Sequence, residues 1–234
     1  MSTINKPNKF LPTTLEEMHD RGWYELDVVL ITGDAYIDSP FMGIAVVGRI
    51  LEDMGLRVGI IGQPDVKSDV DVKRMGEPKL FWGVSGGSID SMVSNYTATK
   101  KFRNDDDYTP GGKNNKRLDR ATLVYTNLIR RSFKSTAPIV LVGIEASLRR
   151  LTHYDYWSNT LRKPILFDSK ADYMIYGMGE QVIIDLGLYL KEGKDVRTIA
   201  GLCYISKEPV KEYLQIPSHK ECLENKEKYI DLFR

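Results

Sequence analysis

The chain has 234 residues, enough for one large domain or a domain with an extension, and its composition of 42% hydrophobic and 28% charged residues indicates a globular protein. Thirty-three basic and thirty-two acidic residues leave a net charge of +1, which excludes long-range attraction to nucleic acid or membranes but leaves a local basic patch open. No apolar run is long enough to span a bilayer, and Met1–Pro12 lacks the apolar core of a signal peptide. Two cysteines favour a reducing compartment over a disulfide framework, so we expect a cytoplasmic protein.

Five short apolar runs predict buried strands, because none of them alternates between polar and apolar residues. They are Asp27–Ile31, Arg57–Ile61, Lys79–Val84, Pro138–Ile144 and Asp172–Tyr176. Continuous apolar character indicates burial on both faces, as in a parallel sheet covered by helices.

Three helical patterns lie between or after these runs. The first has Ser39 as its predicted N-cap and Gly55 as its end, the second begins at Asp119, and the third runs from Glu180 to Gly193. Their predicted inward positions are Ile44, Val47, Leu51 and Met54; Ala121, Val124, Tyr125 and Leu128; and Val182, Ile183, Leu186 and Leu190. The alternation predicts a doubly wound, mostly parallel α/β sheet with helices on both faces and a flavodoxin-like strand order.

The predicted organisation has three parts. Residues 1–24 form an N-terminal extension, residues 25–206 a Rossmann-like domain, and residues 207–234 a charged tail. The polar stretch 100–118 is either a functional arm or a solvated insertion. The apolar last turn at 229–233 has nothing after it to cover it, which hints that the chain is part of something longer.

Ligands of open α/β sheets bind beyond the carboxyl ends of the strands, so the turns there are candidate sites. After the first strand, Gly33 permits a tight turn, Asp34 and Asp38 supply acceptors, and Ser39 begins a helix that could hold an anion. After the third strand, paired glycines could let the backbone approach a ligand between serines that donate hydrogen bonds; the residues are Ser85, Gly86, Gly87 and Ser88. An ordinary capped helix and a plain turn are the alternatives for these two stretches.

The segment Ile144–Trp157 follows the fourth strand and concentrates charge and aromatic rings. Glu145 could reach an arginine or a ligand hydroxyl, and one of Arg149 and Arg150 could face a carboxylate or phosphate. His153 and Tyr154, with the aromatic residues that follow, could stack against a flat group. The alternative is an arginine–glutamate network that braces the sheet edge, with a structural histidine. A glycine-rich turn would complete the rim with Gly177, Gly179 and Glu180.

Metal chemistry has no encoded site in these residues. Cys203 and Cys222 lie far apart without a histidine cluster, and His19, His153 and His219 are scattered. We therefore assign no catalytic residue, no metal ligand and no cofactor to the chain.

Long strings of the sequence closely resemble the N-terminal region of the YgiQ family of radical SAM proteins. They are "FLPTTLEEMHDRGWYELDVVLITGDAYIDSPFMGIAVVGRILEDMGLRVGIIGQPD", "YTPGGKNNKRLDRATLVYTNLIR" and "IEASLRRLTHYDYWS", and the resemblance covers essentially the whole chain. The layout is also similar to the cobalamin-binding-like domain that precedes the catalytic barrel in many radical SAM enzymes. The resemblance implies a parent protein that uses a [4Fe–4S] cluster to cleave S-adenosylmethionine reductively.

Two departures limit what the resemblance places on this chain. The Cys-x-x-x-Cys-x-x-Cys cluster motif and the Asp-x-His-x-x-Gly cobalamin motif are both absent. We therefore expect an accessory N-terminal domain, inactive alone, whose partner is a radical SAM catalytic domain on the same or an adjacent polypeptide. A stand-alone module for a nucleotide or corrinoid is the second hypothesis, and RNA contact through the arm Lys100–Arg117 is the third.

Overall fold

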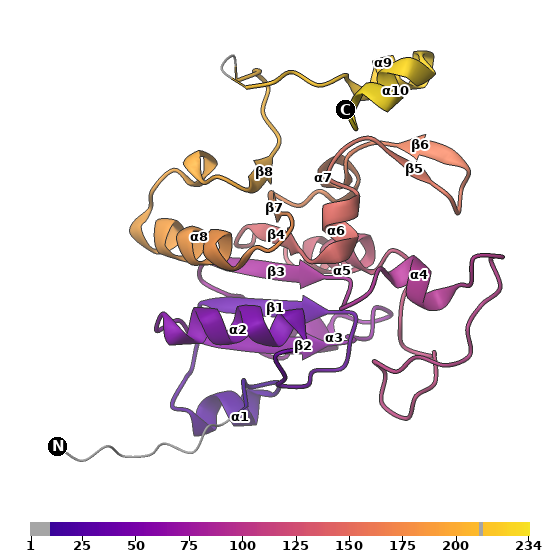
Figure 1. The fold of residues 1–234 in the computed structure, drawn as a ribbon. Helices are drawn as coiled ribbons and strands as arrows, with labels where there is room; N and C mark the ends of the chain where they lie inside the picture. The colour runs from indigo at the N-terminus through magenta and orange to yellow at the C-terminus, as the bar shows by residue number, and fades with distance from the viewer. Residues whose placement is uncertain (1–9, 211–212) are drawn as a thin grey trace.

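The computed structural model describes residues 10–210 and 213–234 and contains one large sheet (Figure 1). The order β2-β1-β3-β4-β7-β8 is formed by Val58–Gly62, Val28–Thr32, Phe81–Ser85, Ile139–Val142, Tyr173–Ile175 and Leu202–Tyr204. The first five strands are parallel to their neighbours, and β8 runs antiparallel to β7. The predicted α/β class and the flavodoxin-like order of the parallel strands are confirmed, and the antiparallel edge strand was not predicted.

Helices cover both faces of the sheet, and a small hairpin stands beyond it. The helices are α1 Leu15–Asp20, α2 Gly43–Asp53, α3 Val70–Lys73, α4 Ser91–Asn95, α5 Ala121–Ser132, α6 Ile144–Leu148, α7 Ile165–Ser169, α8 Glu180–Glu192, the 3₁₀ turn Val196–Thr198, α9 His219–Glu224 and α10 Lys226–Asp231. Figure 1 shows α2 and α8 side by side on one face, with α5 behind the sheet. The hairpin pairs β5, His153–Asp155, with β6, Thr160–Arg162.

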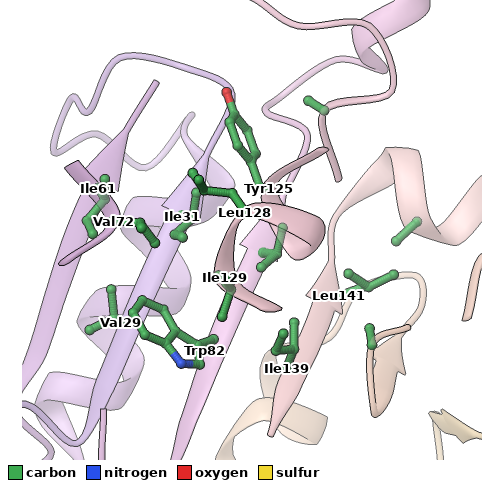
Figure 2. Packing of buried hydrophobic residues seen from close by; sticks show 14 of the residues in the cluster. Val29, Ile31, Ile61, Val72, Trp82, Tyr125, Leu128, Ile129, Ile139 and Leu141 are labelled. Carbon is green, nitrogen blue, oxygen red and sulfur yellow. The ribbon is translucent and has the colours of Figure 1, made fainter. Parts of the chain in front are cut away.

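The core consists of two clusters, one on each face, because successive strand residues point to opposite sides. Val29 and Ile31 of β1 pack with Trp82 of β3 and with Tyr125, Leu128 and Ile129 of α5 on the face that Figure 2 shows. The intervening strand residues pack against α2 and α8 on the other face; they are Val28, Leu30, Val58, Ile60, Phe81 and Val140. Burial of both faces explains why the strand sequences are continuously apolar.

The predicted N-terminal extension contributes to the core, whereas apolar residues at the end of the predicted tail are exposed. Residues 1–9 of the extension and residues 211–212 of the tail lie outside the described residues. Leu11 and Met18 are each 1% exposed and belong to the two core clusters. Within α10 and the residues after it, Ile230 and Phe233 stay 49% and 68% exposed.

The predicted start of the first long helix is wrong. The helix begins at Gly43 with Met42 as N-cap, and Ser39 lies in the preceding turn. The hydroxyl oxygen of Ser39 accepts a hydrogen bond from the amide of Phe41, and its carbonyl accepts one from Met42. A tight turn therefore takes both acceptors of Ser39 before the helix starts.

The predicted start of the second helix is one residue too early. The N-cap of α5 is Arg120, in the left-handed conformation with φ of 50°. The carboxylate of Asp119 instead accepts hydrogen bonds from Asn95 Nδ2 at 2.7 Å and Tyr96 Oη at 2.8 Å. The predicted helix ends at Gly55 and Gly193 are confirmed, because both glycines are left-handed, with φ of 79° and 68°.

Candidate functional site

A cavity of about 360 Å³ opens at the carboxyl edge of the sheet, between the N-termini of α2 and α8. It lies beyond β1, β3, β4 and β7, where open α/β sheets bind ligands, and its volume is within the range of small-molecule sites. Its lining consists of Thr32, Asp34, Pro40, Phe41, Gly43, Ile44, Val46, Val47, Ser85, Gly87, Ser88, Val142, Gly143, Ile144, Ile175, Gly177, Met178, Gly179, Glu180 and Ile183. We call it the edge cavity.

The walls of the edge cavity are largely aliphatic, and its ends carry hydrogen-bond donors. Phe41 and Met178 belong to the lining yet are 90% and 91% exposed, so they form an apolar rim. Neither α2 nor α8 has a side-chain cap from any residue that the structure describes. Free N–H groups and the helix dipole favour acceptor or anionic groups of a ligand at these two ends.

The floor of the edge cavity is set by Asp34, which is 1% exposed. Its Oδ2 accepts a hydrogen bond of 2.6 Å from the amide of Ser88, and its Oδ1 accepts one of 2.7 Å from Arg117 Nη2. Gly87 has φ of 116°, and a Cβ there would collide with the Asp34 carboxylate. The carboxylate therefore holds the turns after β1 and β3 together, and its charge is already paired.

Arg117 links this floor to the arm formed by residues 100–118. Its side chain is fully buried, and it forms ion pairs with Asp34 at 2.7 Å and with Asp106 at 3.0 Å. It also donates a 3.2 Å hydrogen bond to the carbonyl of Gly86. Burial lowers the pKa of Arg117, but the hydrogen bonds from its guanidinium to Asp106 and Asp34 outweigh this and raise the pKa above its ordinary value.

The rest of the arm is tied to the same edge. Thr109 Oγ1 accepts a 2.7 Å hydrogen bond from Gln63, and Ala35 donates a backbone hydrogen bond to the carbonyl of Tyr108. Asn114 is 7% exposed and donates to Asn95 and to the carbonyl of Arg103. The solvated-insertion alternative does not describe these residues, because the arm packs onto the sheet edge.

The predicted site residues divide into those that line the edge cavity and those that do not. Seven line it, namely Asp34, Ser85, Gly87, Ser88, Gly177, Gly179 and Glu180. Gly33 and Gly86 support it from outside, because a Cβ on Gly33 would collide with the carbonyl oxygen of Gly86. The two glycines let the turns after β1 and β3 touch.

Asp38 and Ser39, predicted as pocket or interface residues, do not line the edge cavity. Asp38 forms an ion pair with Arg49 of α2, whose guanidinium also reaches Glu52 at 2.6 Å. Both predicted residues border an open groove on the outer side of α2. Both residues belong to the stretch before Gly43 and lie on the outer side of α2, not at the edge cavity.

Glu145, predicted as a pocket or interface residue, does not line the edge cavity. The chain leaves β4 at Gly143, with φ of 87°, and enters the five-residue helix α6, which buries Glu145 to 1% exposure. Its carboxylate accepts hydrogen bonds from the amides of Ser91 and Thr122 at 2.9 and 3.0 Å, and from the Thr122 hydroxyl at 2.6 Å. It therefore anchors the first residue of α4 and the second of α5.

The two predicted arginines are likewise absent from the cavity lining that the structure describes. Arg149 forms an ion pair with Asp90, the N-cap of α4. Burial lowers the pKa of Arg149, but its hydrogen bond to Asp90 outweighs this and raises the pKa above its ordinary value. Arg150 donates to the carbonyl of Ser147 at 2.8 Å and lies over the ring of Tyr176. A network of acids and arginines braces the edge, as the alternative interpretation holds.

His153 and Tyr154 lie on β5, away from the edge cavity. His153 Nδ1 lies 3.1 Å from the carbonyl oxygen of Leu151, and burial lowers the pKa of this histidine, which favours the neutral ring. The amide of Tyr154 donates to Tyr229 Oη, and its own hydroxyl donates to Asn159. The space beside His153 has a volume of about 10 Å³, room for about one water.

Sequence reasoning missed Arg117 and the apolar walls. Arg117 lies 83 positions from Asp34, and one sequence contains nothing that pairs the two residues. The sequence predicted Ile183 as an inward helix position but not as part of a site, and it predicted no role for Phe41 or Met178. These residues lie directly before or within predicted helices at the carboxyl edge of the sheet, and this position was the sequence signal that could have indicated a role in the site.

Metal ligands do not gather in the described residues. Across residues 10–210 and 213–234, no group of three His, Cys, Asp or Glu side chains could hold a metal ion. Cys203 and Cys222 are free, and burial raises the pKa of both thiols. A [4Fe–4S] cluster needs three or four thiolates, so the residues present do not fit one. The edge cavity likewise contains no histidine to ligate a cobalt ion.

No helix in the described ranges has both the length and the apolar character needed to cross a membrane. Fold and site together define a doubly wound α/β domain with a cavity of about 360 Å³ at its topological switch point. The chain belongs to the Radical SAM N-terminal family, whose model matches residues 10–234, and this confirms the resemblance found in the sequence.

Relatives of the chain are UPF0313 proteins. A UPF0313 protein of Fusobacterium nucleatum is 59% identical over 226 residues, which cover 96% of this chain and 40% of the relative. One from Thermotoga neapolitana is 51% identical with the same two coverages, and one from Clostridium perfringens is 48% identical over 97% of this chain and 35% of the relative. The chain therefore spans about 40% or less of the length of these relatives.

Solved structures share the fold at low sequence identity. The radical S-adenosylmethionine methyltransferase TsrM from Kitasatospora setae, with tryptophan substrate and a SAM analogue bound, matches with a TM-score of 0.52 and 18% identity. The match covers 77% of this chain and 28% of TsrM. TsrM with cobalamin and a [4Fe–4S] cluster bound matches with a TM-score of 0.50. At this identity the likeness concerns the fold.

Proposed function

We propose that this chain is the accessory N-terminal domain of a YgiQ-type radical SAM protein and that its edge cavity holds part of a small ligand for a catalytic domain. Membership in the Radical SAM N-terminal family supports the class, and relatives more than twice as long leave room for such a domain. The catalytic domain would supply the [4Fe–4S] cluster and bind S-adenosylmethionine, in the cytoplasm. This chain would supply binding and orientation.

The observation that carries the proposal is the edge cavity with its exposed apolar rim. Phe41 and Met178 are almost fully exposed at its mouth, and Ile144, also in the lining, is 44% exposed. Apolar side chains gathered around a cavity mouth mark ligand or protein contact surfaces. A catalytic domain docked on this rim would close the cavity and keep water from the reacting ligand.

Association with the catalytic domain can be measured directly. The double variant Phe41→Ser/Met178→Ser should weaken binding of this chain to the carboxy-terminal region of a UPF0313 relative by at least about tenfold, as about 1.4 kcal/mol of lost apolar contact implies. Tyr24→Ser is the matched control, because Tyr24 is 76% exposed and precedes β1 at the opposite edge. Equal binding by all three proteins in analytical ultracentrifugation would refute the docking arrangement.

The second candidate function is a stand-alone small-ligand module, and the cavity's chemistry favours it. Aliphatic walls suit a flat organic ring, and the N-termini of α2 and α8 suit acceptor or anionic groups. TsrM, which shares the fold, has been solved with cobalamin bound, so a corrinoid and nucleotides are the ligands to test.

Thermal unfolding with each ligand tests both functions of the cavity. A ligand at 100 times its Kd should stabilise the chain by about 2.7 kcal/mol. Val47→Phe, which fills the cavity, should abolish the shift, whereas Ile50→Phe introduces the same phenyl ring further along α2, outside the described lining. If no nucleotide, corrinoid or S-adenosylmethionine shifts the wild type, or if Val47→Phe keeps the shift, the cavity is not the binding site.

A further inference from the structure

We propose that a second surface of this chain, built by the arm and the β5–β6 hairpin, binds single-stranded RNA. Four aromatic rings from three separate segments form a continuous row there: Phe102, Tyr96, Trp157 and Tyr156. Neighbouring ring centroids are 5.7, 5.3 and 5.3 Å apart. We call this row, with the cations beside it, the aromatic–basic surface.

The row is held in place by polar contacts between the arm and the hairpin. Tyr156 Oη donates a 2.7 Å hydrogen bond to the carbonyl of Ala98, and Lys100 Nζ donates a 3.4 Å hydrogen bond to the carbonyl of Trp157. Tyr96 donates from its hydroxyl to Asp119. The rings are therefore preorganised, which lowers the entropy cost of binding.

The rings at the two ends of the row remain open to solvent. Phe102 is 52% exposed and Tyr156 is 46% exposed. Unlike the core aromatic residues Trp82 and Tyr125, these rings present area to a partner. Every nucleobase has a π-face, so exposed rings of this kind stack single-stranded bases with little sequence preference.

Positive charge surrounds the row although the chain as a whole is nearly neutral. In residues 100–118, five basic side chains and two acidic ones are exposed, which leaves a net charge of +3. The third acid of the arm, Asp106, is buried and paired with Arg117. Within the described residues, neither Lys101 nor Lys113 forms an ion pair with a carboxylate. These cations remain available to phosphates.

Hydroxyl groups next in sequence to the two inner rings of the row favour RNA over DNA. The hydroxyl oxygens of Thr97 and Thr99 lie 3.0 Å apart beside Lys100, and those of Ser158 and Thr160 lie 2.8 Å apart beside Trp157. Threonine and serine hydroxyls can donate to and accept from the ribose 2′-OH, the group that distinguishes RNA from DNA. Stacking rings, unpaired cations and hydroxyls together fit a single RNA strand.

The test is fluorescence anisotropy of a labelled 12-nucleotide RNA of mixed sequence, titrated with the full chain at several salt concentrations. Five phosphate contacts predict a slope of log K against log[salt] of about −3.5. Phe102→Leu should weaken binding at least about fivefold without changing the slope, because a stacking ring is lost. Lys101→Gln should reduce the magnitude of the slope by about 0.7, because one phosphate contact is lost.

Matched controls lie outside this surface. Tyr24→Leu removes an exposed ring before β1, and Lys191→Gln removes an exposed cation from the last turn of α8. Neither should change RNA affinity or the salt slope, and circular dichroism should show all variants folded. The same sequence as DNA should bind more weakly.

Several results would overturn the proposal. They are undetectable RNA binding at low salt, equal affinities for the Phe102→Leu and Tyr24→Leu variants, and tighter binding of a polyglutamate peptide than of RNA. The last result would assign the surface to an acidic protein segment. Because Val47 is outside this surface, RNA binding by the Val47→Phe variant distinguishes failure here from failure of the edge cavity.

Discussion

Arg117 shows how much of this fold depends on a single charged side chain. Its guanidinium is fully buried between Asp34 and Asp106 and contacts the Gly86 carbonyl. A buried charge is tolerated only when it is paired and hydrogen-bonded, and here every partner belongs to a different loop at the sheet edge. The same side chain therefore stabilises the arm and fixes the floor of the edge cavity.

Replacement of this side chain gives the first prediction. Arg117→Met should lower the free energy of unfolding by about 3–5 kcal/mol, because it leaves two buried carboxylates without a counter-charge. Urea denaturation measures the loss. Lys116→Met, at the exposed neighbouring position, removes the same charge and should cost less than about 0.5 kcal/mol. Equal stabilities of the two variants would show that the buried triad contributes nothing.

The pH dependence of stability gives an independent check on the same triad. Burial raises the pKa of Asp106, but hydrogen bonds from Arg117 and Thr109 outweigh it and lower the pKa below its ordinary value. A lowered folded-state pKa stabilises the fold above the unfolded pKa of about 3.9, and this contribution is lost as the pH falls through the folded value. As the pH decreases below about 4, the free energy of unfolding of the wild type should therefore decrease more steeply than that of the Arg117→Met variant.

At the scale of elements, the short helix α6 organises its neighbours rather than a pocket. Glu145 on α6 accepts hydrogen bonds from the starts of α4 and α5, and Arg149 just after it pairs with the residue that caps α4. Each buried N–H that such a carboxylate satisfies would otherwise cost about 1–3 kcal/mol. The polar residues of this segment therefore stabilise the packing of α4, α5 and α6 against one another.

The adjacent arginines give a matched pair of variants. Arg149→Ala should destabilise the chain by about 2–3 kcal/mol, because it strips the partner from Asp90, which is 4% exposed. Arg150→Ala removes one hydrogen bond to a carbonyl and a contact with Tyr176, and should cost less than about 1 kcal/mol. Thermal and urea unfolding compare them. Loss of equal size in both variants would contradict the bracing role of Arg149.

At the scale of the whole molecule, stability should decline from the middle of the sheet to the antiparallel edge. Every residue of β1 is buried, with strands on both sides and helices on both faces. In β8 only Leu202 is buried, and among the described strands this one pairs only with β7. Local opening therefore requires far less exposed apolar surface at β8.

Hydrogen exchange followed by mass spectrometry tests this gradient. Amides of 28–32 should exchange only through global unfolding, whereas those of 202–204 should exchange at least about tenfold faster, a difference of about 1.4 kcal/mol in opening free energy. Peptides from α8 serve as an internal reference of intermediate protection. Equal protection of β1 and β8 would mean that the edge strand is an integral part of the cooperative core.

The sequence by itself determined the class of the fold, the order of its parallel strands and the family. Continuously apolar runs such as 28–32 and 58–62 require two covered faces, and the glycine ends at Gly55 and Gly193 are local requirements of the backbone. Loops after buried parallel strands must share one edge, which is why Asp34, Ser88 and Gly179 could be assigned to a common cavity.

Only the tertiary structure decided which polar residues face the edge cavity. Asp38 and Glu145 read alike in sequence as acids after strands, yet one pairs with Arg49 on the outer side of α2 and the other anchors α4 and α5. Arg117 reaches Asp34 across 83 positions. Local sequence patterns determine where the backbone turns. The partner of a charged side chain depends on long-range packing, because a buried charge must be paired with an opposite charge that the fold brings close to it.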